Sequence, residues 1–281
     1  PILEATYCEI LNYGAVPAFI GEGFLKLIPK KDKDRLNLSN YRPITLLNTS
    51  YKILTGIINS RLVKILPSII CGSQKGFMKG RRAEDIPRSI QDLIDRSLNH
   101  GRDFATLLVD FNKAFDSISH KFIFSSLLRY GFPMGFINMV GTILRDSFSW
   151  VASNGRRLSF EITQGCKQGD PISPSLFLLA VNNLFHLISQ AAPPRLTQMY
   201  ADDLSVFYEG TCEEISSSIK MTFKVLNNYA THSGLVMNET KTEVLTSIQS
   251  SLVESFPSLK YSSSAILLGI TISKNGSETA T

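Results

Sequence analysis

The chain has 281 residues, 43% of them hydrophobic and 19% charged, which excludes a disordered protein and predicts a core of substantial size. The net charge of +5 is unevenly distributed, because residues 1–82 contain thirteen Lys and Arg against five Asp and Glu, a net charge of +8, whereas residues 83–281 carry −3. A basic N-terminal part predicts a polyanionic partner, although many globular proteins are mildly basic without binding nucleic acid.

The hydrophobic pattern predicts a series of strands and helices. Apolar residues at helical spacing indicate helices, and short runs of β-branched and aromatic residues indicate strands. We expect Pro67 to stop the first long helix and Ser119 to cap a later one. The expected elements are a strand at 23–29, helices at 49–66 and 84–99, a buried strand at 104–111, helices at 119–129 and 133–145, a hairpin of 147–154 with 157–163 around Asn154-Gly155, a helix at 175–188, a hairpin of 196–200 with 204–208, a helix at 212–231, and strands at 242–246 and 265–272.

This order of elements indicates the fold class. Hairpins and helices are mixed without regular β-α-β alternation, and the chain has no internal repeat or low-complexity segment. The pattern predicts an α+β fold in which helices cover one face of an antiparallel sheet.

The stretch Tyr200-Ala201-Asp202-Asp203 lies between the two apolar strands of a predicted hairpin. Two carboxylates so close together repel each other, and a bound cation would neutralise them. Taken alone, the stretch is more typical of a polar hairpin tip than of a metal site, because Asp is a good turn residue.

A third carboxylate, Asp110, ends the buried strand at 104–111. If this strand and the hairpin are neighbours in one sheet, three carboxylates meet at its end. Carboxylate oxygens suit Mg²⁺, and two such ions about 4 Å apart can activate an attacking hydroxyl and stabilise a leaving pyrophosphate. The basic loops near Lys30, near Arg42 and at 79–82 are candidates for contacts with a triphosphate.

The chain resembles the reverse transcriptases of non-LTR (LINE-type) retrotransposons from about residue 24 to 272. The Tyr-Ala-Asp-Asp stretch alone is a weak indication, whereas the whole set of motifs in the right order is specific. The matching stretches are 28–31 with 40–44 (first fingers motif), 74–82 (second fingers motif), 108–117 (palm motif A), 168–174 (motif B), 200–203 (motif C), 234–243 (motif D) and 268–270 (start of motif E).

The resemblance implies roles for the acidic residues. Asp110 and Asp202 would be metal ligands, with Asp203 a third, less direct carboxylate and the backbone carbonyl of Phe111 completing a site. The implied cofactor is a pair of Mg²⁺ ions, which Mn²⁺ can replace. Lys241 would donate a proton to the pyrophosphate.

The resemblance also implies the residues that bind substrate. Lys30 or Lys31, together with Arg42, would hold the incoming triphosphate. Phe115 would lie under the sugar and exclude the 2′-hydroxyl, which selects deoxynucleotides. Gln168 and Gly169 would line the pocket for nucleotide and template. We expect Asp116 and Asp170 to be structural, and none of the four histidines to form a site.

The fold that the resemblance implies is the fingers–palm part of a right-hand polymerase, with an antiparallel palm sheet backed by helices. The expected divisions are basic fingers at 1–100, the motif A strand of the palm at 101–116, a helical connection at 117–147, and a palm with motifs B to E at 148–281. We expect the thumb and endonuclease to be absent, and the chain to be a piece of a longer one, since it begins with Pro1.

The implied activity is RNA-directed DNA polymerase, with an RNA template, a DNA primer and dNTPs as partners and no membrane. The sequence shows no signal peptide and no apolar run of roughly 18 residues. The four scattered cysteines also indicate an intracellular, reduced protein, and the resemblance implies the nucleus and cytoplasm. Two alternatives remain: an inactive relative that binds RNA as a scaffold, and a maturase or telomerase-like polymerase.

Overall fold

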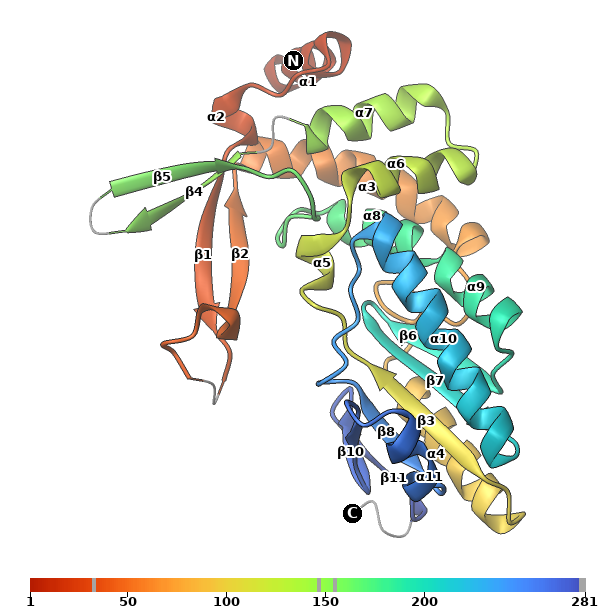
Figure 1. Cartoon of the computed structure of the whole chain (residues 1–281). Helices are drawn as coiled ribbons and strands as arrows, with labels where there is room; N and C mark the ends of the chain where they lie inside the picture. Colours follow the sequence, from red (N-terminus) through yellow and green to blue (C-terminus); the bar gives the residue numbers. More distant parts are fainter. Residues whose placement is uncertain (32–33, 146–147, 154–155, 278–281) are drawn as a thin grey trace. The chain divides into compact units, whose positions relative to one another are not determined.

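The computed structural model describes residues 1–31, 34–145, 148–153 and 156–277. The chain divides into two compact units, each formed from two segments: unit 1 contains Pro1–Ile69 and Phe115–Ala180, and unit 2 contains Ile70–Ala114 and Val181–Thr281. Within the ranges described, none of the helices combines the length and apolar character that crossing a membrane requires. The α+β class is confirmed, because both units combine helices with sheets (Figure 1).

Unit 1 contains a four-stranded sheet with the order β2-β1-β4-β5. Strands β1 and β2 form an antiparallel ribbon, while β1 and β4 are parallel, with Gly23 beside Ser149. Its elements, two of which extend one residue past its bounds, are α1 (Ile2–Tyr13), α2 (Ala18–Gly21), β1 (Gly23–Pro29), the 3-10 helix η1 (Leu38–Asn40), β2 (Tyr41–Leu47), α3 (Thr49–Ile69), α5 (Ala114–Ser117), α6 (His120–Arg129), α7 (Met134–Leu144), β4 (Phe148–Ser153), β5 (Arg156–Glu161) and α8 (Ser173–Val181).

Unit 2 contains a five-stranded sheet with the order β6-β7-β3-β8-β9, in which only the edge pair β8 and β9 is parallel. A separate hairpin, β10 with β11, lies beside helix α4. The elements of unit 2 are α4 (Asp85–Asn99), β3 (Phe104–Val109), α9 (Asn183–Ala191), β6 (Leu196–Tyr200), β7 (Asp203–Glu209), α10 (Cys212–Ser233), β8 (Glu243–Thr246), α11 (Gln249–Ser255), β9 (Lys260–Tyr261), β10 (Ser264–Leu267) and β11 (Ile270–Ser273).

Helices cover both faces of the five-stranded sheet, so the prediction that they cover one face is wrong (Figure 1). On one face, α4 packs its fully buried Ile90 and Ile94 against Phe104 and Phe207, whose rings stack with centroids 5.8 Å apart. On the other face, the Tyr208 hydroxyl is hydrogen-bonded to Thr222 of α10. Burying one such side chain contributes about 1.5–3 kcal/mol, so the two helices hold the central strands firmly.

Most predicted elements are confirmed, with two differences at helix ends and one predicted turn that lies outside the described residues. The first long helix continues through Pro67 to Ile69, because Pro67 lies in its last turn, where a missing N–H costs one hydrogen bond at most. Ser119 is at the N-cap of α6, but its side chain makes no capping bond. The turn at Asn154-Gly155 of the β4–β5 hairpin is outside the described residues, whereas the pairing of its strands is confirmed.

Two predicted elements are each divided into two. The apolar helix expected at 175–188 is interrupted at Asn182, whose side-chain oxygen accepts a hydrogen bond of 2.7 Å from the Cys71 N–H. The strand expected at 265–272 is the β10–β11 hairpin, because Leu268 and Gly269 both have positive φ, at 50° and 83°. Two consecutive residues of positive φ form the tight turn that matches the twist of a hairpin.

Candidate active site

The central strands of unit 2 bring the predicted carboxylates together. Strand β7 pairs with β3 in the register that places Leu204 opposite Val109. Asp203 and Asp110 are the next residues beyond this pair, so they lie across from each other at the end of the sheet. Asp202 is in the turn, and Asp203 already belongs to β7, where it pairs with Tyr200. The expected convergence of three carboxylates is therefore built into the register, although the turn contains only one of the two adjacent acids.

The three carboxyl groups influence one another electrostatically. Burial, together with the charge of Asp110, raises the pKa of Asp202 above its ordinary value. The loss of solvent around the carboxyl, followed by the charges of Asp202 and Asp110, raises the pKa of Asp203 to about 6. Within the described part of the chain, no Lys, Arg or His forms an ion pair with any of the three. A cation from solution would relieve this repulsion.

The loop before β8 supports Asp110 through its backbone. The Asn238 N–H donates to the Asp110 carbonyl at 2.8 Å, and the Asp110 N–H donates to the Thr242 hydroxyl at 3.4 Å. Phe111, buried beside this loop, forms a bridge with Met237. Lys241, which the resemblance assigns to proton transfer, is exposed on the same loop.

Predicted substrate residues of unit 1 gather around the loop before α8. The Phe115 ring stacks on Phe177 with centroids 4.2 Å apart, and the Phe115 carbonyl accepts from the Cys166 N–H at 2.7 Å. The Gln168 carbonyl accepts from the Thr45 N–H at 2.9 Å, and its side chain donates to Asp116 at 3.4 Å. Phe115 and Gln168 are therefore held near each other, and Asp116 braces this loop.

Gly169 lies close to strand β2, and the basic residues lie on the β1–β2 ribbon or directly after β1. A Cβ on Gly169 would come within 2.6 Å of the Thr45 carbonyl oxygen, so a side chain at this position is excluded. Arg42 is exposed on β2 and pairs with Ile28 of β1. Lys30 follows β1 with its N–H bonded to the Asn40 carbonyl at 2.8 Å, and Lys31 is exposed.

A buried polar cluster lies beneath the Gln168–Gly169 turn. The Tyr51 hydroxyl donates to the Asp170 carboxyl at 3.1 Å, and the Ile172 N–H donates to the same carboxyl at 3.2 Å. Burial raises the pKa of Asp170 and lowers the pKa of Lys167 to about 8, with Asp170 opposing the second shift. These contacts support the prediction that Asp170 is structural, and Lys167 is a buried cation to which the sequence interpretation assigned nothing.

The second fingers motif supplies a contact that sequence interpretation missed. Gln74 is fully buried and hydrogen-bonds both the N–H and the carbonyl of Ala201, directly before Asp202. A polar residue between glycine-containing loop residues gave no reason to expect a buried partner. The sequence contains no signal for this contact, because the two residues are 127 positions apart.

The three carboxylates fit a divalent cation whose remaining ligands come from the substrate and water. In the described ranges, no group of three or more His, Cys, Asp or Glu side chains is arranged to hold a metal ion by itself. Mg²⁺ needs only one or two carboxylates when waters and substrate phosphates supply its other ligands. The charge of Asp110 contributes to the raised pKa values of Asp202 and Asp203, so the acidic end of the sheet can accept positive charge.

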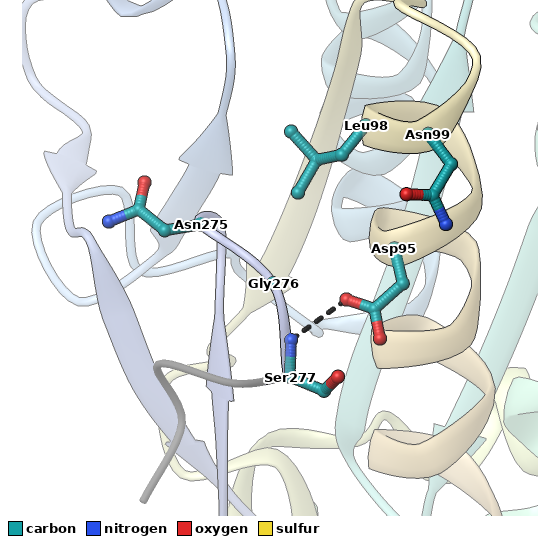
Figure 2. A pocket seen from close by; sticks show the side chains of 6 residues that line it. All are labelled: Asp95, Leu98, Asn99, Asn275, Gly276 and Ser277. Carbon is teal, nitrogen blue, oxygen red and sulfur yellow. Dashed lines mark hydrogen bonds between the residues drawn. The ribbon is translucent and has the colours of Figure 1, made fainter.

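A pocket elsewhere in unit 2 offers no comparable chemistry (Figure 2). It lies between the end of α4 and residues 275–277, and Asp95 is the carboxylate among its described lining residues. The Asp95 oxygen that faces the pocket already accepts bonds from the Ser277 N–H, at 2.9 Å, and from the Gln91 side chain, at 2.9 Å. The Asp95 carboxylate therefore attaches residues 275–277 to α4.

Comparison with known proteins gives the same picture. The protein family described as "Reverse transcriptase (RNA-dependent DNA polymerase)" matches residues 28–272. The chain is 30% identical over 189 residues to the transposon TX1 uncharacterized 149 kDa protein of Xenopus laevis, which covers 67% of this chain and 14% of that protein. It is 28% identical over 180 residues to the Pol polyprotein of the retrotransposable element R2DM of Drosophila melanogaster, covering 60% of this chain and 17% of the polyprotein.

Solved structures support the fold. Apo telomerase from Candida tropicalis, truncated from the C-terminal domain, superposes with a TM-score of 0.64 at 14% identity, covering 97% of this chain and 58% of the telomerase. Candida albicans telomerase, in complex with a fragment of telomeric RNA, gives a TM-score of 0.62 at 13% identity, covering 97% of this chain and 48% of that one. At this identity, the likeness concerns the fold alone.

The family match spans most of the chain, whereas the chain spans only 14% and 17% of the two retrotransposon relatives described above. The matched range contains every predicted motif from residue 28 onward, in the predicted order. The carboxylates of motifs A and C also meet at one end of one sheet. The chain therefore belongs to the reverse transcriptase (RNA-dependent DNA polymerase) family, as a reverse transcriptase domain of the non-LTR retrotransposon type.

Proposed function

We propose that the protein is an RNA-directed DNA polymerase, which extends the 3′-hydroxyl of a primer with deoxynucleotides on an RNA template. The observation that carries this proposal is the register of β3 and β7, which sets Asp110 across from Asp203 and next to Asp202. The pKa values of Asp202 and Asp203 are raised by burial and by neighbouring carboxylates, and no described protein cation is paired with these acids, which favours a reaction in which phosphates arrive with divalent metal ions.

Asp110 and Asp202 would hold these ions, with Asp203 as the less direct ligand and the Phe111 carbonyl as a further donor. We propose two Mg²⁺ ions, which Mn²⁺ can replace. Bound there, the ions would supply positive charge to the attacking and leaving oxygens of the transfer. The chain's own contribution is to hold its carboxylates at fixed positions on strands that are buried on both faces.

The basic residues of the first fingers motif and the motif B residues would bind and orient the nucleotide. Arg42, with Lys30 or Lys31, would bind the triphosphate as charged donors. Gln168 and Gly169 would line the pocket for the base and template. Lys241, exposed in the loop before β8, would donate a proton to the leaving pyrophosphate.

We also propose that residues 1–100 form the fingers, 117–147 a helical connection, and 101–116 with 148–281 the palm. The RNA template and DNA primer would bind through phosphate contacts, in which the net charge of +8 over residues 1–82 takes part. A nuclear and cytoplasmic location is part of the same proposal.

Primer extension tests the proposed activity. The intact protein should extend oligo(dT) on poly(rA) with dTTP when Mg²⁺ is present, and EDTA should abolish the extension. A protein that binds poly(rA)/oligo(dT) but leaves the primer unextended with either Mg²⁺ or Mn²⁺ would refute the proposal and favour an RNA-binding scaffold.

Phe115 provides a second test, because a sugar-selecting side chain must be bulky and held in place. The stack on Phe177 restrains the ring. Phe115→Val should raise ribonucleotide incorporation relative to deoxynucleotide incorporation by roughly 10- to 200-fold, the usual range for removing apolar bulk from a pocket. The matched control is Phe136→Val, which opens the stack with Phe132 in the same unit, at centroids 5.0 Å apart. Equal sugar selectivity in the two variants would contradict the role of Phe115.

A further inference from the structure

The loop at residues 73–76 lies along strand β6 and contacts the tip of the β6–β7 hairpin in unit 2. The Met199 N–H donates to the Ser73 carbonyl at 3.0 Å, and the Lys75 N–H donates to the Met199 carbonyl at 2.7 Å. These bonds add the loop to the edge of β6, with Gln74 bridged to Met199 in parallel. The loop therefore follows the hairpin backbone up to the residue before the turn.

The Gln74 side chain binds the turn itself. Its Oε1 accepts from the Ala201 N–H at 3.0 Å, and its Nε2 donates to the Ala201 carbonyl at 3.1 Å. The same Oε1 accepts from the Gly76 N–H at 2.9 Å. Gln74 has no exposed surface, so these bonds form where water does not compete.

Ala201 needs such support because its backbone is strained. Its φ is +56°, in the left-handed region, which costs a residue with a Cβ about 1–2 kcal/mol. Strained residues persist where the surrounding structure fixes them, and they are concentrated at active sites. Gly76 permits the close approach, since a Cβ there would lie 2.2 Å from the Ala201 nitrogen.

The loop is itself fixed on its far side by Arg81. The Arg81 guanidinium donates to the carbonyls of Cys71 at 2.5 Å, Gln74 at 2.6 Å and Ile70 at 3.1 Å. A cation bound to three backbone carbonyls holds the loop as one piece. Gln74 is thus a short, rigid connection between an anchored loop and the turn that carries Asp202.

We propose that Gln74 is a positioning residue for nucleotidyl transfer, which holds Ala201 in its left-handed conformation and thereby sets the direction of the Asp202 carboxylate. Gln74 touches neither the substrate nor the metal ions. The inference rests on the proposed function, because a fixed Asp202 matters only if it acts in the reaction. Misplacing a reacting group by about 1 Å can cost about 10²-fold in rate.

The chain offers a matched control for this contact. Gln91 of α4 binds one backbone residue in the same way: its Oε1 accepts from the Ser273 N–H at 2.8 Å, and its Nε2 donates to the Ser273 carbonyl at 3.2 Å. Ser273 ends the β10–β11 hairpin, which contains none of the proposed catalytic residues. Gln91→Met therefore removes the same pair of bonds, together with the bond from Gln91 to Asp95, and leaves the Asp202 turn unaffected.

The test compares Gln74→Met with Gln91→Met in the intact protein. We expect Gln74→Met to lower kcat by about 10- to 100-fold, with the KM for dTTP and the affinity for poly(rA)/oligo(dT) within twofold of wild type. Gln91→Met should keep the wild-type kcat. Gln74→Glu is the milder variant if Gln74→Met does not fold, because burial favours the protonated carboxyl, which can still accept from the Ala201 N–H and donate to its carbonyl, and its kcat should fall several-fold.

Amide hydrogen exchange of Ala201 gives a readout that is independent of activity. In Gln74→Met this N–H should exchange at least tenfold faster, while it is unchanged in Gln91→Met. A wild-type kcat in Gln74→Met and Gln74→Glu, or an equal loss of kcat in Gln91→Met, would overturn the inference while leaving the proposed function intact. A wild-type protein without primer extension would overturn the proposed function, and the exchange rate would still show whether Gln74 holds the turn.

Discussion

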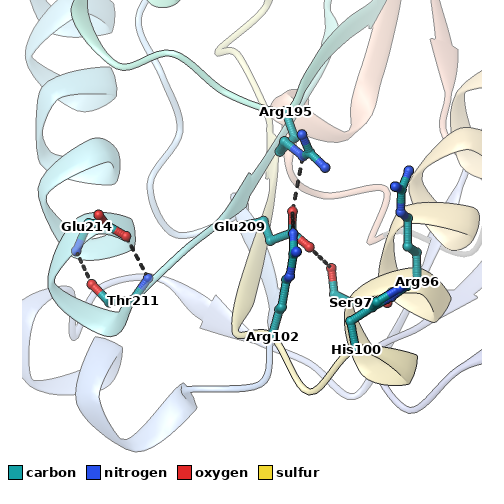
Figure 3. A network of polar contacts seen from close by, with 8 residues as sticks. All are labelled: Arg96, Ser97, His100, Arg102, Arg195, Glu209, Thr211 and Glu214. Carbon is teal, nitrogen blue, oxygen red and sulfur yellow. Dashed lines mark hydrogen bonds and ion pairs between the residues drawn. The ribbon is translucent and has the colours of Figure 1, made fainter.

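The two ends of the β6–β7 hairpin carry carboxylates in opposite electrostatic situations. At the base, the Glu209 carboxylate contacts Arg195 at 3.1 Å and Arg102 at 3.4 Å, and it accepts a bond from the Ser97 hydroxyl at 3.2 Å (Figure 3). At the tip, the charges of Asp202 and Asp110 raise the pKa of Asp203, and no described cation is paired with these acids.

This difference separates a structural acid from a candidate catalytic one. The base acid is neutralised by the protein, so it fixes the start of β6 and the end of β7 to α4. The acids at the tip repel one another, which disfavours the folded protein until an external cation arrives. One hairpin thus combines a stable base with a tip whose charge is left for a metal ion and phosphates to balance.

The largest expected effect follows from removing one charge at the tip. Asp202→Asn should reduce Mg²⁺-dependent primer extension by roughly 10³-fold, because a lost metal ligand costs several kcal/mol of transition-state stabilisation. Binding of poly(rA)/oligo(dT) should stay within about threefold, since phosphate contacts elsewhere dominate affinity.

Glu209→Gln is the matched variant, because it neutralises an acid on the same hairpin. It should retain primer extension within about twofold, since Glu209 is already balanced by Arg195 and Arg102. Near-normal extension by Asp202→Asn would refute its role as a ligand, and equal losses in the two variants would mean that the ends of the hairpin do not differ.

The second largest expected effect is a loss of stability when the acid at the base of the hairpin is neutralised. Glu209→Gln should lower the free energy of unfolding by about 1–2 kcal/mol, between the values for exposed and buried ion pairs, because Glu209 is 9% exposed while Arg102 and Arg195 are 57% and 48% exposed. Urea denaturation measures this loss, and 1 M NaCl should reduce it by screening the pairs. An unchanged free energy would show that the network in Figure 3 is not a stabilising one.

The sequence was sufficient for the elements that carry these acids. Strand β3 reads as a buried apolar run that ends in Asp110, and the two strands of the hairpin flank the adjacent acids. A run that is apolar on both faces needs cover on both, so the presence of α4 and α10 on opposite faces was in principle predictable from residues 104–109. The breaks at Asn182 and at Leu268 depend on local hydrogen bonds and backbone angles that periodicity does not encode.

The support of the site was beyond the reach of sequence patterns. Gln74 and Ala201 are 127 residues apart, and neither the glycine-containing loop nor the turn indicates that one binds the other. The same holds for the pairing of Glu209 with Arg102, which depends on the register of β3 and β7. Sequence motifs locate the acids. Whether an acid is neutralised by a protein cation depends on contacts that only the folded structure shows.

The smallest expected effect is the pH dependence of stability at the tip. The folded-state pKa of Asp203, about 6, lies above the ordinary value of 3.8. Above pH 6 the carboxyl is ionised in both the folded and the unfolded state, so its repulsion destabilises the folded state by the full amount. As the pH falls from 6 to 3.8 the folded state binds the proton first, so this penalty disappears. Asp203→Asn should therefore raise the melting temperature at pH 7, by only about 1–2 °C because Asp203 is partly exposed. Below pH 4 the substitution should leave the melting temperature unchanged.

Mg²⁺ should replace the proton in the same experiment. At pH 7 without nucleotide, saturating Mg²⁺ should raise the melting temperature of the wild type by about 2 °C, and that of Asp203→Asn by less, since less repulsion remains to be relieved. Glu209→Gln should keep the full Mg²⁺ response, although it starts from a lower melting temperature, because its change lies at the base. A lower melting temperature for Asp203→Asn at pH 7 would show that this acid is already balanced by the protein, and the contrast between tip and base would then fail.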